Sequence, residues 1–258
     1  MEQPKVLVGC PTSHHKDYCL DRYVKSVNTL SYPNYDVLIV DNSETDEYYN
    51  KIKEKGLPVL RLEKYYEHAR TRLTKSRNII REKLLEGDYE YFLSLEQDVI
   101  PPRDIIETLL KSKKKVICGV YYNNSKDHPP GIKPLLWRLA TKEELDKIIT
   151  SDNPVYATIQ KQIKDGEIKT PEKIVSRCTC EEVEEPRIFE IFETGVGCML
   201  IHRSILEKIE FRSPLNATSF DDLWFCEDVR NSDCKLFVDT SVKCKHLVDG
   251  MEWGKIKY

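Results

Sequence analysis

The stretch YEYFLSLEQDVIPP, residues 89–102, joins an apolar, β-rich run to the acidic triplet Glu96-Gln97-Asp98 and closes with two prolines. A strand that ends in polar residues at a turn is typical of the ligand-binding edge of a Rossmann-like sheet. Residues i and i+2 of a strand project to one side, so Glu96 and Asp98 would share a side of the strand end. Two such carboxylates form a hard oxygen site suited to Mg²⁺ or Mn²⁺. An ordinary solvated loop is the alternative that this stretch alone leaves open.

Similar β-rich runs alternate with amphipathic stretches through the first 120 residues. Apolar side chains recur at helical spacing between them, and a further helix follows Pro101-Pro102, where proline fits a first turn. This is the pattern of βαβ units, and it predicts an α/β protein with a Rossmann-like sheet. The predicted strands of this half are Lys5–Val8, Asp36–Val40, Val59–Leu62, Tyr89–Leu95 and Val116–Val120.

Residues 123–186 differ in composition, because they are rich in Lys and Glu and contain two weakly periodic helical stretches, Glu143–Ile149 and Ile159–Ile163. Such a stretch is more often an inserted lid or edge than a separate core. A chain of 258 residues with 40% apolar side chains suffices for one large core, so we expect a single domain with halves at 1–122 and 187–258. In the second half the sequence predicts strands at Ile188–Glu193, Gly197–His202, Leu236–Asp239 and Val242–Lys245, and helices at Ser204–Ile209 and Asp222–Ser232.

Charge and composition argue against several classes of protein. The 40 Lys and Arg residues against 43 Asp and Glu give a net charge of −3 that is spread along the chain, which argues against a nucleic-acid binder. The first ten residues do not form a signal peptide and no 18 apolar residues run together, so the sequence predicts a cytoplasmic protein without a transmembrane segment. The nine cysteines lie mostly in apolar runs and indicate buried thiols, while the C-x-C pair Cys178 and Cys180 is weak evidence for zinc.

Polar residues at other strand ends are further candidates for ligand binding. The first strand runs into Gly9–Ser13, interpreted as a turn, which lacks the G-x-G-x-x-G fingerprint and so counts against a dehydrogenase. Asp41 follows the second strand and could accept hydrogen bonds from a base or ribose, although Asp is also a common turn residue. Arg77, in the helix before the acidic strand, could reach a pyrophosphate, but taken singly it indicates a surface residue.

The C-terminal half adds acidic residues at a predicted helix start. Asp221 and Asp222 precede LWFCEDVRNSD, where acidic side chains favour the helix dipole and can serve only as caps. A carboxylate there is also well placed to take a proton from an attacking hydroxyl. The pair Glu227-Asp228 is more typical of the solvated face of the same helix. His246 ends the last strand and could complete a divalent-cation site, though a lone histidine is more often structural.

The chain resembles a GT-A glycosyltransferase, and among these the inverting family 2 enzymes, in the order of its motifs: VLVGCPT, LIVDNS, a helix with SRN, a strand ending in EQD, ETGVGCMLIHRS, DDLWFC and KCKHL. The resemblance covers nearly the whole chain except 123–186. It implies a nucleotide-diphospho-sugar transferase fold with a central mixed, mainly parallel sheet flanked by helices. In that fold 1–122 would bind the nucleotide sugar, 123–186 would form a lid or acceptor region, and 187–258 would be the acceptor and catalytic half.

On the donor side, the resemblance implies that Pro11 and Thr12 line the nucleotide pocket and that Asp41 contacts the base. Arg77 would face the nucleotide and its diphosphate, and Gln97 would belong to the same donor-binding surface.

The triplet Glu96-Gln97-Asp98 stands where the family has its D-x-D motif, with Glu in place of the first Asp. The resemblance implies that Asp98 is the metal ligand and that Glu96 lies nearer the ribose or a metal-bound water. His246 matches the family's late metal-binding histidine, and Thr194–Gly197, with little side-chain bulk, would let the sugar approach the backbone.

For the catalytic base, the family pattern has an acidic pair about eleven residues before the turn that opens the next strand. Asp222 lies eleven residues before Asp233, which stands where the family usually has Gly, and so Asp222 is the predicted base rather than Asp228. Asp221 replaces the usual Glu of the pair and keeps its charge.

The sequence therefore predicts a metal-dependent enzyme that moves a sugar from a UDP- or GDP-sugar to a glycan, lipid-linked or small-molecule hydroxyl acceptor, with inversion. Mn²⁺ or Mg²⁺ is the expected cofactor, and peripheral docking at a membrane is compatible with a lipid-linked acceptor. Two alternatives stay open: a nucleotidyltransferase that makes a nucleotide sugar, and a non-catalytic nucleotide- or carbohydrate-binding protein on the same fold.

Overall fold

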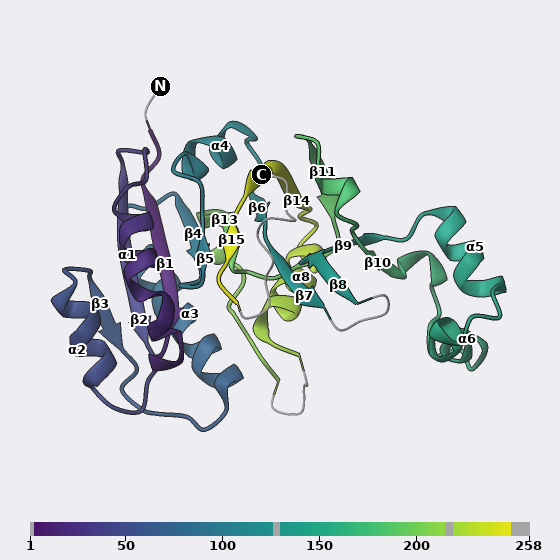
Figure 1. Ribbon diagram of the computed structural model, residues 1–258, viewed down its shortest axis with the longest axis horizontal. Coiled ribbons are helices and arrows are strands. Elements are labelled where there is room, and N and C mark those ends of the chain that lie inside the picture. The colour runs from purple at the N-terminus through teal and green to yellow at the C-terminus, as the bar shows by residue number, and fades with distance from the viewer. Residues whose placement is uncertain (1–2, 126–129, 215–218, 249–258) are drawn as a thin grey trace.

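The computed structural model describes residues 3–125, 130–214 and 219–248, and its centre is an eight-stranded sheet (Figure 1). The strand order is β11-β14-β6-β13-β4-β1-β2-β3. Pairs within β14-β6 and within β4-β1-β2-β3 are parallel, whereas β13 runs antiparallel to both of its neighbours and β11 antiparallel to β14. The strands are β1 (Val6–Thr12), β2 (Tyr35–Asp41), β3 (Val59–Arg61), β4 (Tyr91–Leu95), β6 (Val116–Val120), β11 (Ile188–Ile191), β13 (Cys198–His202) and β14 (Leu236–Lys243). The expected mixed, mainly parallel sheet is confirmed.

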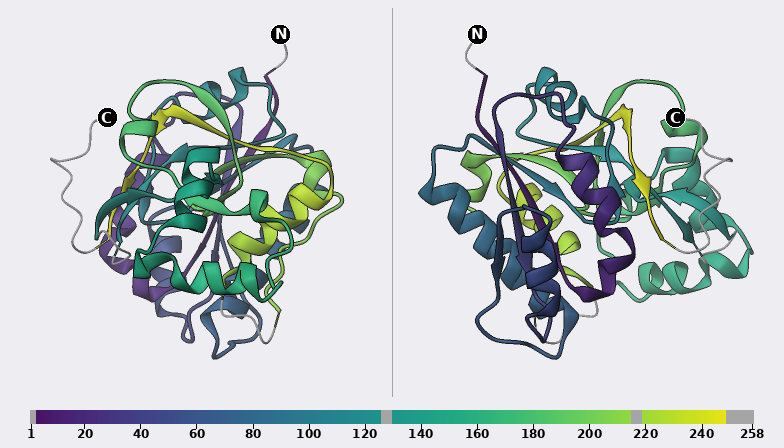
Figure 2. Two further views of the ribbon diagram at one scale, coloured as in Figure 1. Left: turned by 90° about the vertical axis from the view of Figure 1, so that its right-hand side faces the viewer. Right: turned by 60° about the vertical axis from the view of Figure 1, so that its left-hand side comes forward.

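Helices cover both faces of this sheet (Figure 2), because successive strand residues point to opposite sides. In β1, Val6 and Val8 pack into one apolar core, while Leu7 packs into the other. The first core contains apolar residues of α1, α2 and α4, and the second those of α3, α7 and α8. These helices are α1 (Leu20–Val27), α2 (Glu47–Glu54), α3 (Ala69–Glu86), α4 (Ile105–Lys111), α7 (Arg203–Leu206) and α8 (Asp221–Asn231).

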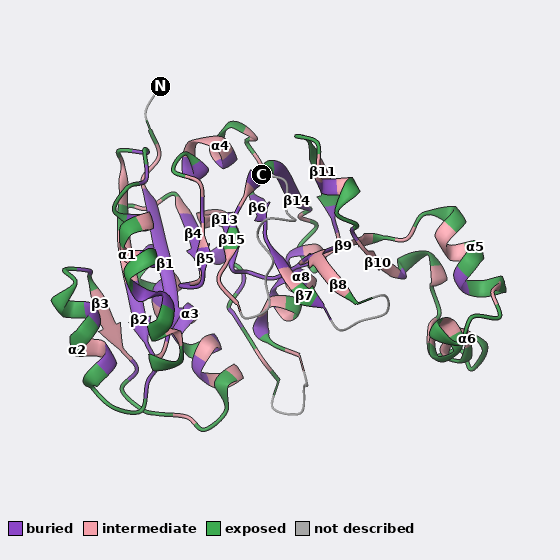
Figure 3. Ribbon diagram, in the orientation of Figure 1, coloured by how far each residue is buried: buried purple, intermediate pink, exposed green. Residues whose placement is uncertain are grey.

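Most of the segment between the two halves leaves the central sheet and forms structure of its own. The hairpin strands β7 (Tyr122–Ser125) and β8 (Gly131–Pro134) lead to a three-stranded sheet in the order β10-β9-β12. Between β9 and β10 the chain forms an arm that projects from the body and is largely exposed (Figures 1 and 3). The elements are β9 (Leu136–Leu139), α5 (Lys142–Thr150), α6 (Ala157–Lys164), β10 (Val175–Arg177) and β12 (Glu193–Thr194), with short 3-10 turns at Pro154–Tyr156, Pro171–Lys173 and Glu181–Val183.

Two predicted boundaries are wrong in ways that bear on the site. The predicted turn after Val8 is strand, because β1 continues to Thr12, which pairs with Asp41. A proline is tolerated there because β4 pairs with β1 only as far as Gly9, which leaves one side of Pro11 outside the ladder. The predicted helix after the two prolines begins only at Ile105, so they precede its first turn.

The acidic triplet is a turn and not the last part of a strand, because β4 ends at Leu95 and the N–H of Val99 donates to the carbonyl of Glu96 at 2.9 Å. The strand-spacing argument for Glu96 and Asp98 therefore does not apply. The turn leads into the short strand β5 (Val99–Ile100), which pairs with β15 (Lys245–His246). Along the described parts of the chain, the structure contains no helix with the length and apolar character needed to cross a bilayer.

Candidate active site

Sheet topology brings the predicted site residues to one edge. The carboxyl ends of the parallel strands β1, β2 and β4 carry Thr12, Asp41 and the acidic turn. Because β13 runs antiparallel to β4, its start meets the end of β4, and the N–H of Glu96 donates to the carbonyl of Gly197 at 2.9 Å. The start of α8 and the pairing of β15 with β5 complete this edge.

Asp98 is fully buried at this edge and has two basic neighbours. Its Oδ2 accepts a hydrogen bond from Lys16 Nζ and lies 3.3 Å from His246 Nε2. Its Oδ1 has no hydrogen-bond partner among the residues that the structure describes. Burial acts to raise the pKa of Asp98, but the hydrogen bond from His246 and the charge of Lys16 outweigh it and lower the pKa to about 2. Asp98 is thus an ionised carboxylate with one open oxygen.

His246 is oriented by its other ring nitrogen. Nδ1 lies 2.8 Å from the carbonyl oxygen of Tyr122, which can only accept, so Nδ1 carries a proton. Nε2 faces Asp98, to which it donates, and it would have to release its proton to bind a cation. A histidine held in this way is the usual arrangement for a metal ligand. No cluster of three His, Cys, Asp or Glu side chains with metal-binding geometry occurs in the described ranges. The open Asp98 oxygen and the His246 nitrogen fit a divalent cation that draws its remaining ligands from substrate and water.

A second ionic cluster lies on the other side of the acidic turn. Arg77, from the middle of α3, is 2% exposed and donates from Nη1 to both oxygens of Asp221, at 2.6 and 2.7 Å. Its Nη2 donates to Glu96 Oε1 at 2.5 Å. Arg77 therefore connects α3, α8 and the acidic turn, and it is buried, whereas the sequence taken singly indicated a surface residue. Its predicted contact with a nucleotide diphosphate stays a prediction.

Asp221 and Asp222 are adjacent at the start of α8 but have different environments. Asp221 is fully buried against Arg77, whereas Asp222 lines a cavity and accepts a hydrogen bond from the N–H of Leu223 at 2.8 Å. Burial raises the pKa of Asp222 to about 6, with Arg77 opposing the rise and Asp221 adding to it. A carboxylate with a pKa in this range is suited to general-base catalysis near neutral pH.

Asp228 and Asp233 are the two residues that the sequence analysis used to select Asp222, rather than Asp228, as the predicted base. Asp228 forms a two-pronged ion pair with Arg212, with N···O distances of 2.7 and 2.8 Å, at the surface of α8. Asp233 has a φ of 55°, the left-handed conformation for which the family pattern has glycine. The role of Asp222 as a base stays a prediction.

The cavity next to Asp222 has a volume of about 490 Å³ and a mixed lining. Its ionisable side chains are Glu96, Glu193, Asp222 and His246. Gly195 lets Tyr121 pack against the backbone at the cavity wall, because a Cβ at Gly195 would collide with the hydroxyl of Tyr121. The apolar lining comes from Tyr121, Leu135, Trp137, Phe220 and Leu223.

Sequence reasoning missed Tyr121 and Trp137. Tyr121 directly follows the apolar run of β6, so the rule that ligands bind at strand ends had the signal to find it. Its hydroxyl accepts a hydrogen bond from the N–H of Gly197 at 3.1 Å, and its ring meets His246 edge-on at 5.3 Å. Trp137 lies in β9, where it pairs with Glu193 and Arg177 of distant strands, and no local pattern indicated it.

The donor-side candidates line the end of β1. Thr12 Oγ1 donates to Gln97 Oε1 at 2.5 Å, and Gln97 Nε2 donates to the carbonyl of Lys16 at 2.6 Å. Gln97 is therefore held by protein partners, and Pro11 is buried beside Thr12 in the strand. Asp41 accepts hydrogen bonds from Ser43 through Oδ1, whereas its buried Oδ2 has no partner within the described part of the chain. Burial raises the pKa of Asp41.

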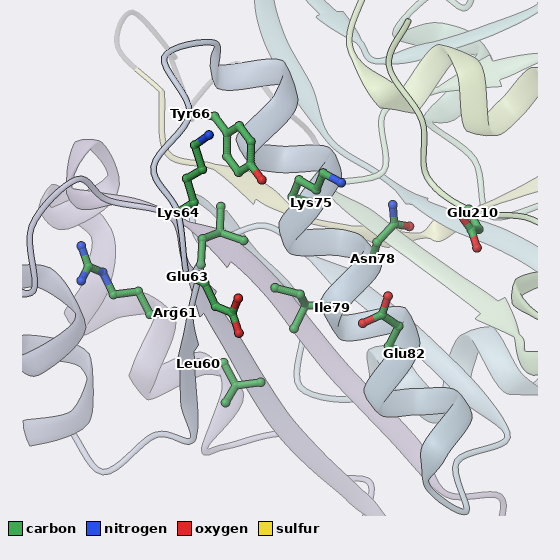
Figure 4. A pocket seen from close by; sticks show the side chains of 11 residues that line it. Leu60, Arg61, Glu63, Lys64, Tyr66, Lys75, Asn78, Ile79, Glu82 and Glu210 are labelled. Carbon is green, nitrogen blue, oxygen red and sulfur yellow. The ribbon is translucent and has the colours of Figure 1, made fainter.

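A larger cavity, of about 570 Å³, lies between β3 and α3 (Figure 4). Lysine and glutamate side chains line it, and the predicted site residues do not. Asn78 borders this cavity, whereas its neighbour Arg77 points to the ionic cluster. Size alone would select this cavity, but the carboxylates and the histidine lie in the smaller one.

The C-x-C pair has two different environments. Cys178 is buried, whereas Cys180 is exposed and its Sγ lies 3.4 Å from the carbonyl oxygen of Ile132. With no three-residue metal-binding cluster in the ranges described, the two thiols have no further ligands there for zinc.

No protein-family model matches the chain, and no curated protein matches it in sequence. Solved structures do match. GalNAc-T7 with UDP, GalNAc and Mn²⁺ matches at a TM-score of 0.60 and 14% identity, over 94% of this chain and 44% of that chain. The mannosyltransferase PcManGT from Pyrobaculum calidifontis, with GDP-Man and Mn²⁺, matches at 0.55 and 12% identity, over 98% and 59%. S. aureus TarS 1–349 in complex with UDP-GlcNAc matches at 0.52 and 13% identity, over 98% and 62%.

The fold is GT-A. The expected fold class is confirmed by the sheet and by these neighbours, which are GT-A glycosyltransferases. The chain spans between 44% and 62% of the length of these three solved chains. At identities of 12–14% the likeness concerns the fold, and the activity has to be argued from the site.

Proposed function

We propose that this GT-A protein transfers a sugar from a UDP- or GDP-sugar to a hydroxyl acceptor, with inversion, and uses Mn²⁺ or Mg²⁺. The observation that carries the proposal is one cavity lined both by Asp222, whose pKa is about 6, and by His246, which contacts the ionised Asp98. The complexes of GalNAc-T7 with UDP, of TarS with UDP-GlcNAc and of PcManGT with GDP-Man support the donor class.

Asp98 and His246 would hold the cation, through the open Oδ1 and through Nε2. When bound, the cation supplies positive charge that stabilises the leaving diphosphate. Glu96 Oε1 accepts a hydrogen bond from Arg77. Glu96 Oε2 lies beside Gly197, where a Cβ built on that glycine would be 3.2 Å from it. That second oxygen would contact the ribose or a cation-bound water.

Asp222 would act as the catalytic base. Its carboxylate takes the proton of the acceptor hydroxyl as that oxygen bonds to the anomeric carbon, and the bond from this carbon to the diphosphate oxygen breaks on the opposite face. The products are the glycoside with inverted configuration, UDP or GDP, and protonated Asp222. Asp221 would be a positioning residue, because it ties the start of α8 to Arg77 and does not itself line the cavity.

The nucleotide would lie along the ends of β1 and β2. Asp41 Oδ2 is a buried acceptor without a described partner, which suits an N–H of the base. Pro11 and Thr12 would form the wall beside it, and Gln97 would keep Thr12 in place. In this placement the nucleotide would contact polar side chains that already lie at the ends of β1 and β2.

The acceptor would lie against the apolar lining of the cavity. Trp137 and Leu135 come from the 123–186 segment, while Phe220 and Leu223 flank Asp222 and are 44% and 36% exposed. An apolar wall beside a single base suits the C–H face of a sugar ring, or the apolar part of a lipid-linked or small-molecule acceptor. This placement makes the segment part of the acceptor site.

The test is to measure UDP or GDP release from a panel of UDP- and GDP-sugars with Mn²⁺, with and without glycan acceptors, for wild type, Asp222→Asn and Asp228→Asn. We expect release by wild type and by Asp228→Asn, because Asp228 is paired with Arg212 away from the cavity. We expect Asp222→Asn to reduce turnover by about 10²–10⁴-fold, which is the usual contribution of a general base.

Binding is measured in parallel by thermal shift, since a ligand that binds only the folded state raises the melting temperature. If Asp222→Asn binds the donor and turns it over at the wild-type rate, Asp222 is not the base. A melting shift with nucleoside triphosphates alone would replace the proposal by a nucleotidyltransferase, and a shift with free glycans alone would replace it by a binding protein.

A further inference from the structure

Asp98, the carboxylate proposed to bind the cation, forms an ion pair with Lys16 of the same chain. The ammonium group of Lys16 donates to Asp98 Oδ2, on the same oxygen that faces His246. Asp98 is 0% exposed at its side chain, whereas the Lys16 side chain is 36% exposed. Lys16 thus reaches a buried carboxylate from the solvent side.

The backbone of Lys16 is held, so the side chain is the part that can move. Its carbonyl accepts from Gln97 Nε2 at 2.6 Å, and its N–H donates to the carbonyl of Ser13 at 2.8 Å. Gln97 directly precedes Asp98, which fixes the distance between the Lys16 backbone and the carboxylate. The ammonium group ends a flexible four-carbon stem, and another anion within reach of that stem can take it.

A divalent cation on Asp98 and the ammonium group of Lys16 on the same carboxylate would repel each other, since like charges a few ångströms apart in a buried site are unfavourable. The cation, on Oδ1, is therefore bound more weakly while the ammonium group stays on Oδ2 and more tightly once it leaves. A departing ammonium group is stabilised by a new anionic partner, and a diphosphate is an anion that lysine binds well.

We propose that Lys16 competes with the divalent cation for Asp98 and transfers to the diphosphate of the donor, which makes cation binding depend on donor binding. This rests on the cation site of the proposed function and adds a regulatory residue to it. The dependence is reciprocal, because the factor by which the nucleotide tightens the cation equals the factor by which the cation tightens the nucleotide.

The experiment measures Mn²⁺ binding by the loss of the free-ion EPR signal, without nucleotide and with saturating UDP or GDP, after subtracting the Mn²⁺ that the same nucleotide binds in the absence of protein. The variants are Lys16→Met, which removes the ammonium group, Lys16→Arg, which keeps the charge, and Lys51→Met as the matched control. Lys51 forms an exposed ion pair with Asp17, next to Lys16 in sequence, so its removal changes the net charge equally. No turnover is needed for this readout.

We expect Lys16→Met to bind Mn²⁺ without nucleotide about tenfold more tightly than wild type, a size typical of coupled sites. The tightening of Mn²⁺ by UDP or GDP should shrink in Lys16→Met and persist in Lys16→Arg and Lys51→Met. Circular dichroism of each variant confirms folding, and Lys16→Arg keeps the test decisive if Lys16→Met does not fold, since loss of coupling in Lys16→Arg overturns the competition.

Equal Mn²⁺ affinity of wild type and Lys16→Met without nucleotide would reject the competition and leave the cation site intact. Binding of UDP or GDP in EDTA with equal affinity by wild type and Lys16→Met would show that Lys16 does not transfer to the diphosphate, and would also reject the proposal. If neither wild type nor Lys16→Met binds Mn²⁺ under any condition, the cation site of the proposed function fails, and the competition fails with it.

Discussion

Two buried ionic clusters flank the turn Glu96-Gln97-Asp98, and they differ in how their charges are satisfied. In the cluster around Arg77, both oxygens of Asp221 and one oxygen of Glu96 accept from guanidinium nitrogens, and the arginine is 2% exposed. In the cluster around Asp98, one carboxylate oxygen has two basic neighbours and the other has none among the described residues.

The difference separates a structural role from a binding role. In the cluster around Arg77 only the second oxygen of Glu96 is not bound to the guanidinium, and the ion pairs fix α3, α8 and the acidic turn relative to one another. A buried carboxylate with an open oxygen is costly unless something completes it, and such groups are expected at functional sites. The fixed cluster thus positions Asp222 and Glu96, while the open cluster is left for a ligand.

The largest effect is expected from removing the centre of the fixed cluster. Arg77→Met leaves the buried Asp221 without its partner, and breaking a buried ion pair on one side costs about 3–5 kcal/mol. Urea unfolding at pH 7, followed by circular dichroism, measures the loss. The matched control is Arg212→Met, whose partner Asp228 is at the surface, with an expected cost of about 0–1 kcal/mol. Equal losses in the two variants would show that the buried cluster is no more important than a surface pair.

A smaller effect is expected from the open cluster. The pKa of Asp98 is about 2 in the folded protein and 3.8 as its ordinary value, so ionised Asp98 stabilises the fold by roughly 2 kcal/mol above pH 4. That stability is lost as the pH falls from 4 toward 2. We expect Asp98→Asn to be less stable than wild type at pH 7 in EDTA, with the gap closing in urea titrations toward pH 3. A gap that is constant with pH would mean that the charge of Asp98 does not stabilise the fold.

The comparison also shows where sequence reasoning succeeds. The strand β6 has the predicted ends, and both ends of α8 lie within one residue of the predicted helix Asp222–Ser232, because period and burial are local properties. The convergence of Asp41 and the acidic turn followed from the parallel order of β1, β2 and β4, since parallel strands end at the same edge.

What escaped prediction depends on contacts between distant residues. Arg77 indicated a surface residue because its partners, Glu96 and Asp221, are 19 and 144 positions away. The wall of the cavity depends on the pairing of β9 with β10 and β12, which no local pattern encodes. The predicted strand ended at Leu95, as β4 does, but the spacing argument applied strand geometry to the acidic triplet, where the hydrogen bond from the N–H of Val99 to the carbonyl of Glu96 closes a turn.

The smallest effect is expected in the pH dependence of the transfer rate, which depends on Asp222 and not on the cluster around Arg77. The Asp222 pKa of about 6 lies above the ordinary 3.8 because of burial, and only the ionised form can accept a proton. The rate of transfer at low substrate should therefore rise about tenfold per pH unit below pH 6 and level off above pH 7. Asp228→Asn should keep this profile, since Asp228 is remote from the cavity, and Asp222→Asn should lose the step near pH 6. The same step in Asp222→Asn would assign the titration to another group of the cavity, and Glu193, which also lines it and whose pKa burial also raises, would be the next candidate for the base.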